Sequence, residues 1–522
     1  MPQLNRERSQ QEQRRRTRGR YQVFLAVGSN QGDSFASIDT GLQLLCDPTF
    51  SDDPYLPTEL VRSSFLYYTK PMYVTDQPSF WNGAVELDTD YDPPSLLRRL
   101  KRVEEYLGRN FTQIRNGPRP LDMDILLYYD NDNIDKESSE AMPTSASVPL
   151  VVETPNLVIP HCRLQEREFV LAPLIDVAGR SLIHPTSSTA SSSGSEQELE
   201  KDTTLGDILD NLVRSKENSD ADEPSAIRLL PLPRERFLLF DRTLIMGILN
   251  VTPDSFSDGG KWTDDVDRAV ARAKEMVEEG ATIIDIGGES TRPGATEIEV
   301  EEQIRRTVPV IEALRKQSKE VVVSIDTRHA AVAKAAIEAG ADIVNDVSGG
   351  SHDPNMLSTV ADLKVPIVLM HMRGTPESMQ GLTDYDDQGG AVDGVTKALL
   401  DRSRAAEEAG IPRWLQILDP GIGFAKDIDG NLSLLKHYSD LRMKLGDFPL
   451  LLGTSRKGFI GKLSGESEAE KRDFGTVASC VAALCLGKRG NNSSLGCNIL
   501  RVHNVKGAKQ AIAVMDAIIE AQ

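Results

Sequence analysis

Residues 244–260 read LIMGILNVTPDSFSDGG and begin a pattern that recurs to the end of the chain. The run 244–249 is apolar and has the length of a buried strand. Polar residues and the turn formers Pro253, Gly259 and Gly260 follow it. Polar side chains directly after the carboxyl end of a strand are typical of an α/β active site, although an ordinary strand-to-helix loop is also polar. The rest of the chain decides between these two interpretations.

The strand-then-helix pattern occurs eight times from residue 244 onward. Helical stretches such as 266–279, 330–339 and 505–517 separate the strands. Eight units in about 280 residues match the count and size of a (β/α)₈, or TIM, barrel. A doubly wound α/β sheet is the alternative, but it rarely reaches eight strict units. The predicted strands are residues 244–249, 282–286, 321–325, 342–344, 365–370, 415–418, 450–452 and 499–502.

Charged or polar side chains follow every one of the eight predicted strands. The carboxyl ends of barrel strands form one face, and catalysis is built on that face. Any single residue could be a loop cap, but packing alone does not explain all eight. In chain order they are Asn250; Asp285, Glu289, Ser290, Thr291 and Arg292; Asp326 and Thr327; Asn345 and Asp346; His371 and Arg373; Asp419; Ser455, Arg456 and Lys457; and Arg501 and His503.

The composition limits the class of protein. A chain of 522 residues predicts two or three domains. Its 59 basic and 79 acidic residues give a net charge of −20, which argues against a nucleic-acid partner. No apolar run approaches the length of a membrane span, so no membrane association is expected. The five cysteines form no C-x-x-C pair, which favours reduced thiols in a reducing compartment.

The first half of the chain predicts a different arrangement. Residues 1–20 contain seven arginines and two acidic residues, which favours a disordered basic tail in a cytoplasmic protein, with a mitochondrial transit peptide as the alternative. Residues 21–185 predict a compact α+β domain, with strands at 21–27, 60–68, 81–88, 121–129 and 157–159 and helices at 94–107 and from 167. Residues 186–235 are Ser-rich or charged and predict a flexible linker, in which 205–213 could form a short helix. The barrel then occupies residues 236–522.

The barrel half resembles dihydropteroate synthase. The motifs NVTPDSFSDGG, GGESTRPGA, SIDT, NDVSGG, MHMRG, DPGIGF, GTSRKGFIG and RVHNV occur in that family's order between residues 244 and 505. The resemblance implies that 4-aminobenzoate condenses with 6-hydroxymethyl-7,8-dihydropterin pyrophosphate. The products would be 7,8-dihydropteroate and pyrophosphate.

The same resemblance implies three groups of binding residues at the barrel mouth. Carboxylates, an amide and a lysine suit the donors and acceptors of a pterin, and arginine suits pyrophosphate. Asn250 also suits Mg²⁺, whereas Phe256 and Pro293 could serve only loop packing. The pterin group is Asp326, Asn345, Met370, Asp419, Phe424 and Lys457. The pyrophosphate group is Asn250, Thr291, Arg292, Arg501 and His503, and the aminobenzoate group is Phe256, Thr291, Pro293 and Ser455. Asp326, Asp419, Lys457 and Arg501 are expected to be catalytic.

The first domain resembles 6-hydroxymethyl-7,8-dihydropterin pyrophosphokinase. VFLAVGSNQGD, DQPSFWNGAV and GPRPLDMDILLY carry the resemblance, which covers residues 21–185 and implies a ferredoxin-like α+β sandwich. That enzyme makes the ester that the barrel would consume, using ATP. Asp122 and Asp124 are two apart on a strand, so they face one side and suit Mg²⁺ ions on ATP phosphates. A lone D-x-D is more commonly an exposed polar face.

The resemblance also assigns the other kinase residues. Flanking arginines would clamp the triphosphate and its developing charge. The expected catalytic residues are Arg109, Arg119, Asp122 and Asp124. The expected ATP contacts are Lys101, Glu104, Arg119, His161 and Arg167, and the expected pterin contacts are Thr69, Phe80, Asn82 and Phe169.

Three positions depart from these family patterns. Asn116 precedes Gly117 where bacterial relatives carry Trp, and Phe111 stands where a basic residue would help to hold phosphate. Both put the closure of the kinase loop in doubt. Asn504 replaces a common Asp in RVHNV, with no expected loss.

Two rival hypotheses for function remain at this point. The barrel could be a pterin-binding methyltransferase module for a corrinoid protein, or one half could be a non-catalytic scaffold. The absence of a corrinoid domain and the full residue sets argue against them. A homodimer through the barrel is expected from the resemblance.

Overall fold

The computed structural model describes residues 19–50, 56–114, 116–131, 148–185, 203–217, 226–251, 262–289, 297–446, 448–487 and 496–520. The chain divides into two compact units, Met1–Leu229 and Leu230–Gln522. Each unit is described by itself.

The first unit is built on an antiparallel sheet. Strand β1 (Tyr21–Ser29) lies in the middle and pairs with β4 (Phe80–Thr89) on one side and with β5 (Asp122–Asp130) on the other. The order β3-β4-β1-β5, with β3 at Leu66–Thr69, is that of a ferredoxin-like sandwich and confirms the predicted α+β class. Beyond this core lie β2 (Thr58–Ser63), β6 (Val148–Pro149), the hairpin of β7 (Val152–Thr154) and β8 (Leu157–Ile159), and the first residues of β9 (Ile227–Leu232).

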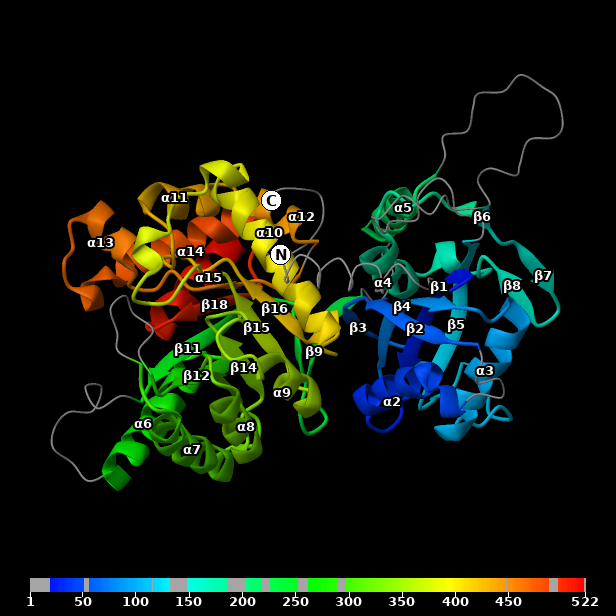
Figure 1. The fold of residues 1–522 in the computed structure, drawn as a ribbon, viewed down its shortest axis with the longest axis horizontal. Helices are drawn as coiled ribbons and strands as arrows, with labels where there is room; N and C mark the ends of the chain where they lie inside the picture. Colours follow the sequence, from blue (N-terminus) through cyan, green and yellow to red (C-terminus); the bar gives the residue numbers. More distant parts are fainter. Residues whose placement is uncertain are drawn as a thin grey trace, which may run out of the picture. The chain divides into compact units, whose positions relative to one another are not determined.

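Helices cover both faces of this sheet (Figure 1). Helices α2 (Ser34–Cys46) and α3 (Pro93–Tyr106) lie on one face, and α4 (Glu168–Ala178) and α5 (Leu205–Glu217) lie on the other. Helix α3 starts where Asp92 accepts a hydrogen bond from the Ser95 amide at 2.8 Å, with proline at its first position. Capping of this kind fixes where the helix begins, and therefore which of its side chains reach the sheet.

Helix α5 corrects the prediction that residues 186–235 form a flexible linker. Leu205 is fully buried in the core of the first unit beside Leu171 and Leu174 of α4, and Ile208, Leu209 and Leu212 pack against the same cluster. These positions recur at helical spacing, so the segment has an apolar face to bury. The predicted short helix at 205–213 is therefore a structural part of the first unit. Residues 186–202 and 218–225 of the predicted linker lie outside the described residues.

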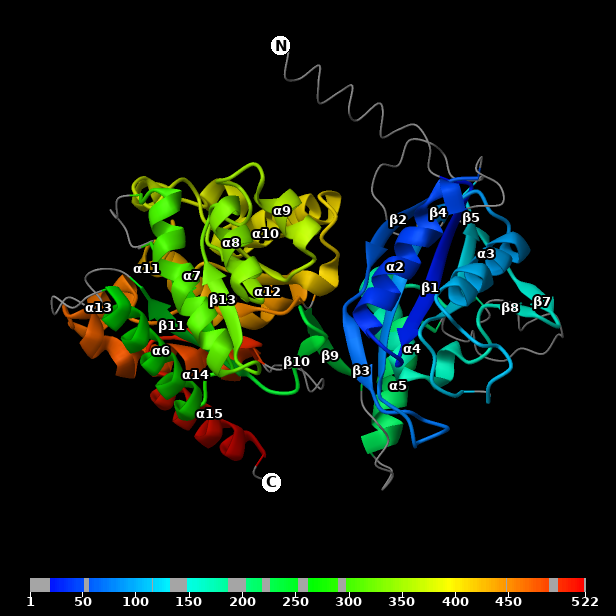
Figure 2. The ribbon, with the colours of Figure 1, turned by 90° about the horizontal axis from the view of Figure 1, so that it is seen from below.

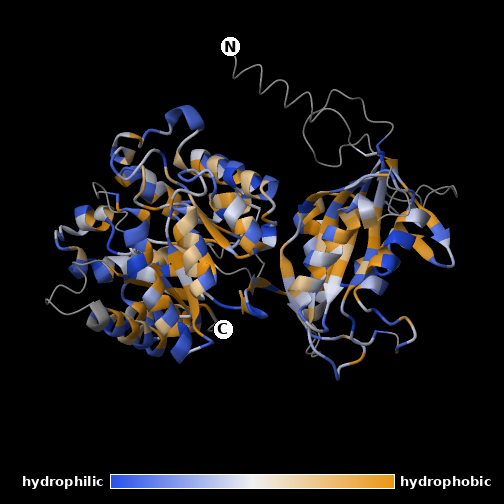
Figure 3. Ribbon diagram, turned by 60° about the horizontal axis from the view of Figure 1, so that its bottom comes forward, coloured by the Kyte–Doolittle hydropathy of each residue, from blue (hydrophilic) through white to orange (hydrophobic). Residues whose placement is uncertain are grey.

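The second unit is a parallel β-barrel surrounded by helices, as predicted (Figure 2). The strand order is β16-β15-β14-β13-β12-β11-β18-β17, and a parallel bridge between Leu418 and Leu450 brings the two ends of the sheet together. Hydrophobic residues concentrate on the strands (Figure 3). Every residue of β12 and β13 is buried. The strands are β11 (Leu244–Asn250), β12 (Ile283–Gly287), β13 (Val322–Asp326), β14 (Ile343–Asp346), β15 (Ile367–Met370), β16 (Gln416–Asp419), β17 (Leu451–Leu452) and β18 (Ile499–Val502).

Helices follow the strands around the barrel. They are α6 (Trp262–Glu279), α7 (Val300–Gln317), α8 (Ala330–Ala339), α9 (Met356–Leu363), α10 (Ala391–Glu408), α11 (Ile428–Lys436), α12 (Tyr438–Lys444), α13 (Gly458–Ser464), α14 (Asp473–Gly487) and α15 (Val505–Glu520). Short 3₁₀ turns lie at Pro48–Phe50, Leu164–Glu166, Met379–Gly381, Asp386–Gln388, Arg413–Leu415 and Ala469–Arg472. Among the described residues, no helix combines the length and the apolar composition that crossing a membrane requires.

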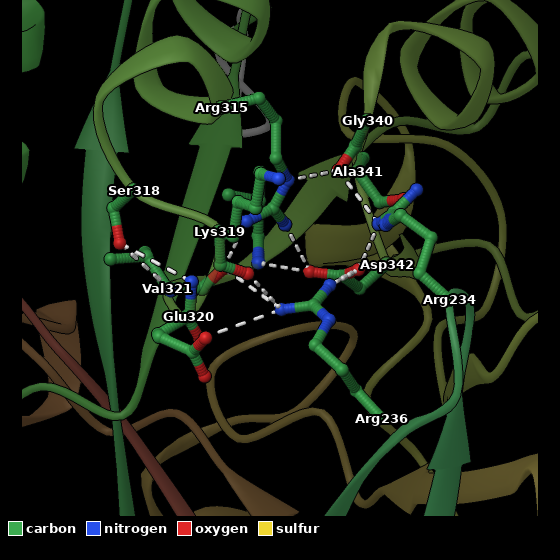
Figure 4. Close-up of polar contacts among 11 residues, drawn as sticks. Arg234, Arg236, Arg315, Ser318, Lys319, Glu320, Val321, Gly340, Ala341 and Asp342 are labelled. Carbon is green, nitrogen blue, oxygen red and sulfur yellow. Dashed lines mark hydrogen bonds and ion pairs between the residues drawn. The ribbon is translucent and has the colours of Figure 1, made fainter.

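A hairpin closes the amino-terminal end of the barrel. Leu230 and Leu232 of β9, and Leu238 of β10 (Arg236–Leu239), join a buried cluster with residues near the start of the barrel strands. Arg234, Arg236 and Arg315 all donate to the fully buried carboxylate of Asp342 (Figure 4). The Val323 amide donates to it as well, at 2.9 Å. This clamp holds the floor of the barrel and leaves the opposite, carboxyl-terminal end for the site.

Candidate active sites

The first unit contains a cavity of about 470 Å³ at one end of its sheet. Asn82 of β4, Gly28 of β1 and Asp122 of β5 lie side by side across its floor. A Cβ on Gly28 would lie 2.8 Å from Oδ1 of Asn82, so glycine leaves room for the polar side chains on both sides. Ten of the predicted site residues line this cavity: Thr69, Phe80, Asn82, Arg109, Arg119, Asp122, Asp124, His161, Arg167 and Phe169.

The paired carboxylates of β5 differ in their surroundings. Asp122 accepts from Arg109 and, at 2.8 Å, from Arg119. Burial raises the pKa of Asp122, but these two guanidiniums outweigh burial and hold its pKa below the ordinary value. Burial and the neighbouring Asp122 instead raise the pKa of Asp124, which has no ion pair among the described residues. A bound divalent cation would give this carboxylate a direct ionic partner.

Lys101 and Glu104 do not line the cavity. Glu104 is fully buried on α3, and it accepts from Lys101 at 2.8 Å and from the Met123 amide at 2.8 Å, while its Oε2 forms an ion pair with Arg109 at 2.9 Å. Burial raises its pKa. The geometry makes Glu104 a positioning residue that orients Arg109 and strand β5, and this differs from the nucleotide contact that the family pattern implied.

Asn30 is a structural residue that sequence reasoning missed. Its Oδ1 accepts from the Arg119 amide at 2.9 Å, and its Nδ2 donates to the Pro78 carbonyl at 2.9 Å and to Gln77 at 3.1 Å. It therefore ties the loop before β4 to the segment that carries Arg119. The only signal in the sequence was its place in a Gly-Ser-Asn turn.

Aromatic and polar groups form the rest of the kinase cavity. Asn82 donates to Thr69 at 2.7 Å, which fixes the direction of its amide. The guanidinium of Arg119 lies 5.3 Å from the ring centroid of Phe80, and that of Arg167 lies 5.6 Å from the ring of Phe169. Burial lowers the pKa of His161, so a neutral imidazole is favoured at this position in the cavity wall. The cavity thus combines flat apolar rings with a cationic rim.

The second unit contains a cavity of about 1400 Å³ at the carboxyl-terminal end of the barrel. Ten predicted site residues line it: Asn250, Asp326, Asn345, Met370, Asp419, Phe424, Ser455, Lys457, Arg501 and His503. They come from six strands and the segments that follow strands β16, β17 and β18. The other predicted residues, Phe256, Thr291, Arg292 and Pro293, lie outside the described residues.

Arg501 connects the carboxylates in the centre of the barrel mouth. It donates from Nε to Asp285 at 2.7 Å and from Nη2 to Asp326 at 2.6 Å. Asn345 donates to the same Asp285 oxygen at 3.0 Å. Asp285 is fully buried and was named only as a residue after the second strand. A charged residue inside an otherwise apolar strand was the signal for its role, which is to hold the guanidinium of Arg501.

The two aspartates that face the cavity resist ionisation. Burial raises the pKa of Asp326 to about 7, against the opposing effect of Arg501 and with a further rise from Asp285. Burial also raises the pKa of Asp419, whose Oδ1 accepts from the Gly421 amide at 2.7 Å. The protonation of Asp326 is therefore sensitive to pH near neutrality.

An aromatic ring and a cation line the cavity beside Asp419. Nζ of Lys457 lies 3.8 Å from the ring centroid of Phe424, and Phe424 packs in an apolar cluster with Met370 and Val347. Buried Lys426, which also lines the cavity, donates to the Gly421 and Phe424 carbonyls at 2.9 and 2.8 Å. Its Nζ also lies 3.0 Å from Nδ1 of His371. Burial lowers the pKa of both groups well below their usual values. Sequence reasoning did not assign this pair.

Neighbouring residues in the loop after β17 make different contacts. Ser455 lies 2.9 Å from Nδ1 of His503 at the cavity wall. Arg456 has a φ of 58° and forms a bidentate ion pair with Asp473, at 2.8 and 3.0 Å. Asn504 donates to the same Asp473 at 3.3 Å. In the motif SRK, all three residues thus line the cavity, and Arg456 also fixes the loop to α14.

Comparison with known proteins agrees with these two sites. The family model for 7,8-dihydro-6-hydroxymethylpterin-pyrophosphokinase (HPPK) matches residues 24–179, and that for the pterin binding enzymes matches residues 246–503. A folate synthesis bifunctional protein of Arabidopsis thaliana is 39% identical, over 95% of this chain and 96% of its own length. A second, named mitochondrial, is 39% identical over 96% of this chain and 83% of its own. The dihydropteroate synthase of Xanthomonas albilineans, solved with 4-aminobenzoic acid, is 43% identical. It covers 56% of this chain and 100% of its own, with a TM-score of 0.50.

Fold and sites together define a two-domain pterin transferase. The chain belongs to the family of bifunctional folate synthesis proteins. It joins a hydroxymethyldihydropterin pyrophosphokinase to a dihydropteroate synthase, which catalyse consecutive steps. Both predicted activities and the predicted family are thereby confirmed. The family assignment decides against the methyltransferase and scaffold alternatives.

Proposed function

We propose that the kinase cavity binds ATP with Mg²⁺ at Asp122 and Asp124. The chemistry of the donors supports this, because Asp124 is buried beside a second carboxylate and forms no ion pair among the described residues. Asp122 and Asp124 would hold the Mg²⁺, which would supply positive charge to the phosphates during transfer of the pyrophosphoryl group. Arg109 and Arg119, held by Glu104 and Asn30, would orient the phosphates from the other side.

The hydroxymethylpterin would bind at the other end of the kinase cavity. Asn82 offers an amide whose orientation Thr69 already fixes, and it can pair with the donors and acceptors of the pyrimidine edge. The rings of Phe80 and Phe169 supply apolar faces for stacking. In this arrangement the pterin hydroxyl would face the phosphates, and catalysis would come mainly from positioning.

In the barrel, we propose that the pterin ring lies against Phe424 and Met370. Ionised Asp326 and Asp419 would accept from its N–H groups, and Asn345 and Lys457 would bind its carbonyl and ring nitrogens. Arg501, His503 and Asn250 would hold the pyrophosphate, with Thr291 and Arg292 completing this group, and Asn250 is also the proposed ligand for Mg²⁺. Loss of pyrophosphate would leave a ring-stabilised cation for attack by the amine of 4-aminobenzoate.

The aminobenzoate would bind beside Ser455, with Phe256, Thr291 and Pro293 as further predicted contacts. One solved relative was crystallised with 4-aminobenzoic acid, and the Yersinia pestis enzyme with a sulfonamide drug at 39% identity and a TM-score of 0.50. A sulfonamide should therefore compete with 4-aminobenzoate and not with ATP. Competition with ATP would contradict this assignment.

One observation carries the proposal for the whole chain: each unit has its own cavity, and ten predicted site residues line each of them. The purified chain should convert hydroxymethyldihydropterin, ATP, Mg²⁺ and 4-aminobenzoate into dihydropteroate and AMP. Omitting 4-aminobenzoate should stop the reaction at the pyrophosphate ester with AMP still formed. Dihydropteroate formation without ATP would contradict the order of the two steps.

We also propose that the barrel forms a homodimer. Phe474 of α14 is 92% exposed, and Val514 and Ile518 of α15 are 61% and 69% exposed. Contiguous exposed apolar residues of this kind mark an interaction surface. Light scattering should give the mass of two chains, and Phe474→Asp should halve it.

For the compartment, we propose the cytoplasm. The alternative rests on the Arg-rich segment 1–20 and on the relative named mitochondrial. A fluorescent fusion of the full chain, compared with one that lacks residues 1–20, would distinguish the two. Import that depends on these residues would overturn the cytoplasmic assignment.

A further inference from the structure

Three potential metal ligands meet outside both cavities, at the carboxyl-terminal end of the barrel. Glu297 lies just before α7, His329 caps the amino end of α8, and His352 lies between β14 and α9. One oxygen of Glu297 lies 3.3 Å from Nε2 of His329 and 3.3 Å from Nε2 of His352. The ligand atoms all lie within 4.8 Å of one another. Three separate segments of the chain therefore present their ligand atoms to one point.

The two separations from Glu297 match the edge of a tetrahedral site. Zinc binds imidazole nitrogen and carboxylate oxygen at about 2.0–2.1 Å. Two ligands of a regular tetrahedron with such bonds are about 3.3–3.4 Å apart, because the edge is about 1.63 times the bond length. Both separations from Glu297 fall at this value. Two histidines and one glutamate are also a ligand set that zinc enzymes use.

The surroundings of these three residues favour a bound cation over hydrogen bonds between the side chains alone. Nε2 of His329 is buried and makes no hydrogen bond to any described residue, although the carboxylate oxygen is close. The two imidazole rings meet edge to face, with centroids 5.0 Å apart. The nearest guanidinium, that of Arg328, lies 3.6 Å from Glu297 and is itself paired with buried Glu289 at 3.1 Å. The positive charge of Arg328 is therefore already balanced by Glu289.

From this geometry we infer that Glu297, His329 and His352 form a Zn²⁺ site. The side chain of Glu297 is 52% exposed and that of His352 28% exposed, so solvent can reach the ion and supply the fourth ligand. The site is distinct from the residues proposed for the pterin, pyrophosphate and aminobenzoate.

The location gives the ion a structural role. Glu289 and Glu297 flank residues 290–296, which include Thr291, Arg292 and Pro293. Glu289 is held by Arg328 and accepts from the Ile298 amide at 3.2 Å. Zinc on Glu297 and His329 would fix the second end of this segment to the start of α8. This structural role of the zinc rests on the proposed role of residues 290–296 in the barrel reaction. The inference that Glu297, His329 and His352 bind zinc does not depend on that role.

The test is direct metal binding by the full chain. The chelator-stripped protein, with Mg²⁺ present to occupy the carboxylate pair of the kinase, is titrated with Co²⁺ as a spectroscopic probe and with Zn²⁺ in calorimetry. We expect one equivalent with the intense visible bands of tetrahedral cobalt. Glu297→Gln and His352→Gln should each weaken binding by more than about tenfold, since even groups that only support metal ligands change affinity 10–100-fold.

His437→Gln is the matched control, because His437 lies on the same unit and its Nδ1 contacts only the Ser433 carbonyl at 3.0 Å. It should keep the full equivalent of metal. Hydrogen exchange at residues 297–303 should slow on adding Zn²⁺ to the parent chain and not to the two ligand variants. Failure of the parent to bind, or equal binding by parent and ligand variants, would overturn the site. Zinc binding without any effect on the KM for 4-aminobenzoate would refute only the structural role toward the reaction.

Discussion

Arg501, on the last strand of the barrel, donates to Asp326, on the third, at 2.6 Å, and its second bond to Asp285 keeps the guanidinium in place. One positive charge is therefore shared between two carboxylates. Asp285 and Asp326 raise the pKa of Arg501 above its usual value, in spite of burial, so the guanidinium stays charged. The arrangement orients Asp326 toward the cavity before any substrate binds.

Replacing Arg501 with Ala should lower the efficiency of dihydropteroate formation. The variant loses a charge-assisted hydrogen bond of roughly 1.5–3 kcal/mol, or about tenfold to a hundredfold in kcat/KM. Formation of AMP by the first unit should not change. Arg404→Ala, on the exposed face of α10, is the control for a lost surface charge. Equal effects of the two substitutions would contradict the role assigned to Arg501.

The affinity of the barrel for pterin should depend on pH through Asp326. Its pKa is raised to about 7, so the carboxylate that accepts from the pterin is lost as pH falls through this value. Calorimetry across about one pH unit on either side should show affinity increasing with pH. Because the folded pKa lies above the unfolded one, Asp326 favours folding at low pH, and this contribution is lost as pH rises toward 7. Asp326→Asn should weaken binding and remove this pH dependence.

Asp124→Asn should abolish the kinase step. The substitution keeps the shape of the side chain and removes one of two charged metal ligands. The barrel should still condense supplied pterin pyrophosphate with 4-aminobenzoate. Asp130→Asn, at the other end of the same strand, is the matched control. Production of AMP within about twofold of the parent by Asp124→Asn would show that the pair does not hold the metal, since loss of a true ligand costs at least 10-fold.

Asp342→Asn should destabilise the barrel without touching either cavity. The change leaves the guanidiniums of Arg234, Arg236 and Arg315 without their shared charge, and breaking such a buried pair costs about 3–5 kcal/mol. The temperature at which synthase activity is lost should fall, while that of the kinase stays constant. Asp401→Asn, in an exposed pair with Arg404, should change neither of these two temperatures.

Leu205→Asp should destabilise the kinase. Leu205 is fully buried between α5 and α4, and burial of such a side chain contributes about 1.5–3 kcal/mol. The exposed Asn211→Asp on the same helix is the control. A fragment that ends at residue 195 should likewise melt below one that ends at residue 229. Equal melting of the two fragments would show that α5 is dispensable.

Periodicity and strand ends predicted most of the fold and of both cavities. Side chains two apart on a strand must share a face, which placed Asp122 and Asp124 together. The carboxyl ends of eight parallel strands must meet, which brought Asp326, Asp419, Lys457 and Arg501 to one mouth. These arguments succeed because they depend only on backbone geometry.

The residues that escaped prediction act through long-range contacts. Asn30 is joined to Arg119 across 89 residues, and Asp285 to Arg501 across 216. Glu104 was placed correctly on its helix, but its burial depends on packing against β5. Helix α5 has a clear apolar face, and its surroundings of Ser-rich and charged sequence concealed its attachment to α4. A local pattern can show that such a residue is unusual, but it does not show which distant residue it contacts.

The clamp on Asp342 also bears on how the chain is made. Synthesis proceeds from the amino end, so Arg234 and Arg236 leave the ribosome 108 and 106 residues before their shared carboxylate. Until residue 342 emerges, the hairpin that becomes the barrel floor has no counter-charge to dock on and only part of the barrel to cover. The first piece of the barrel to be translated must therefore wait for its partner, and a ribosome paused within this interval would display an apolar, cationic hairpin to chaperones.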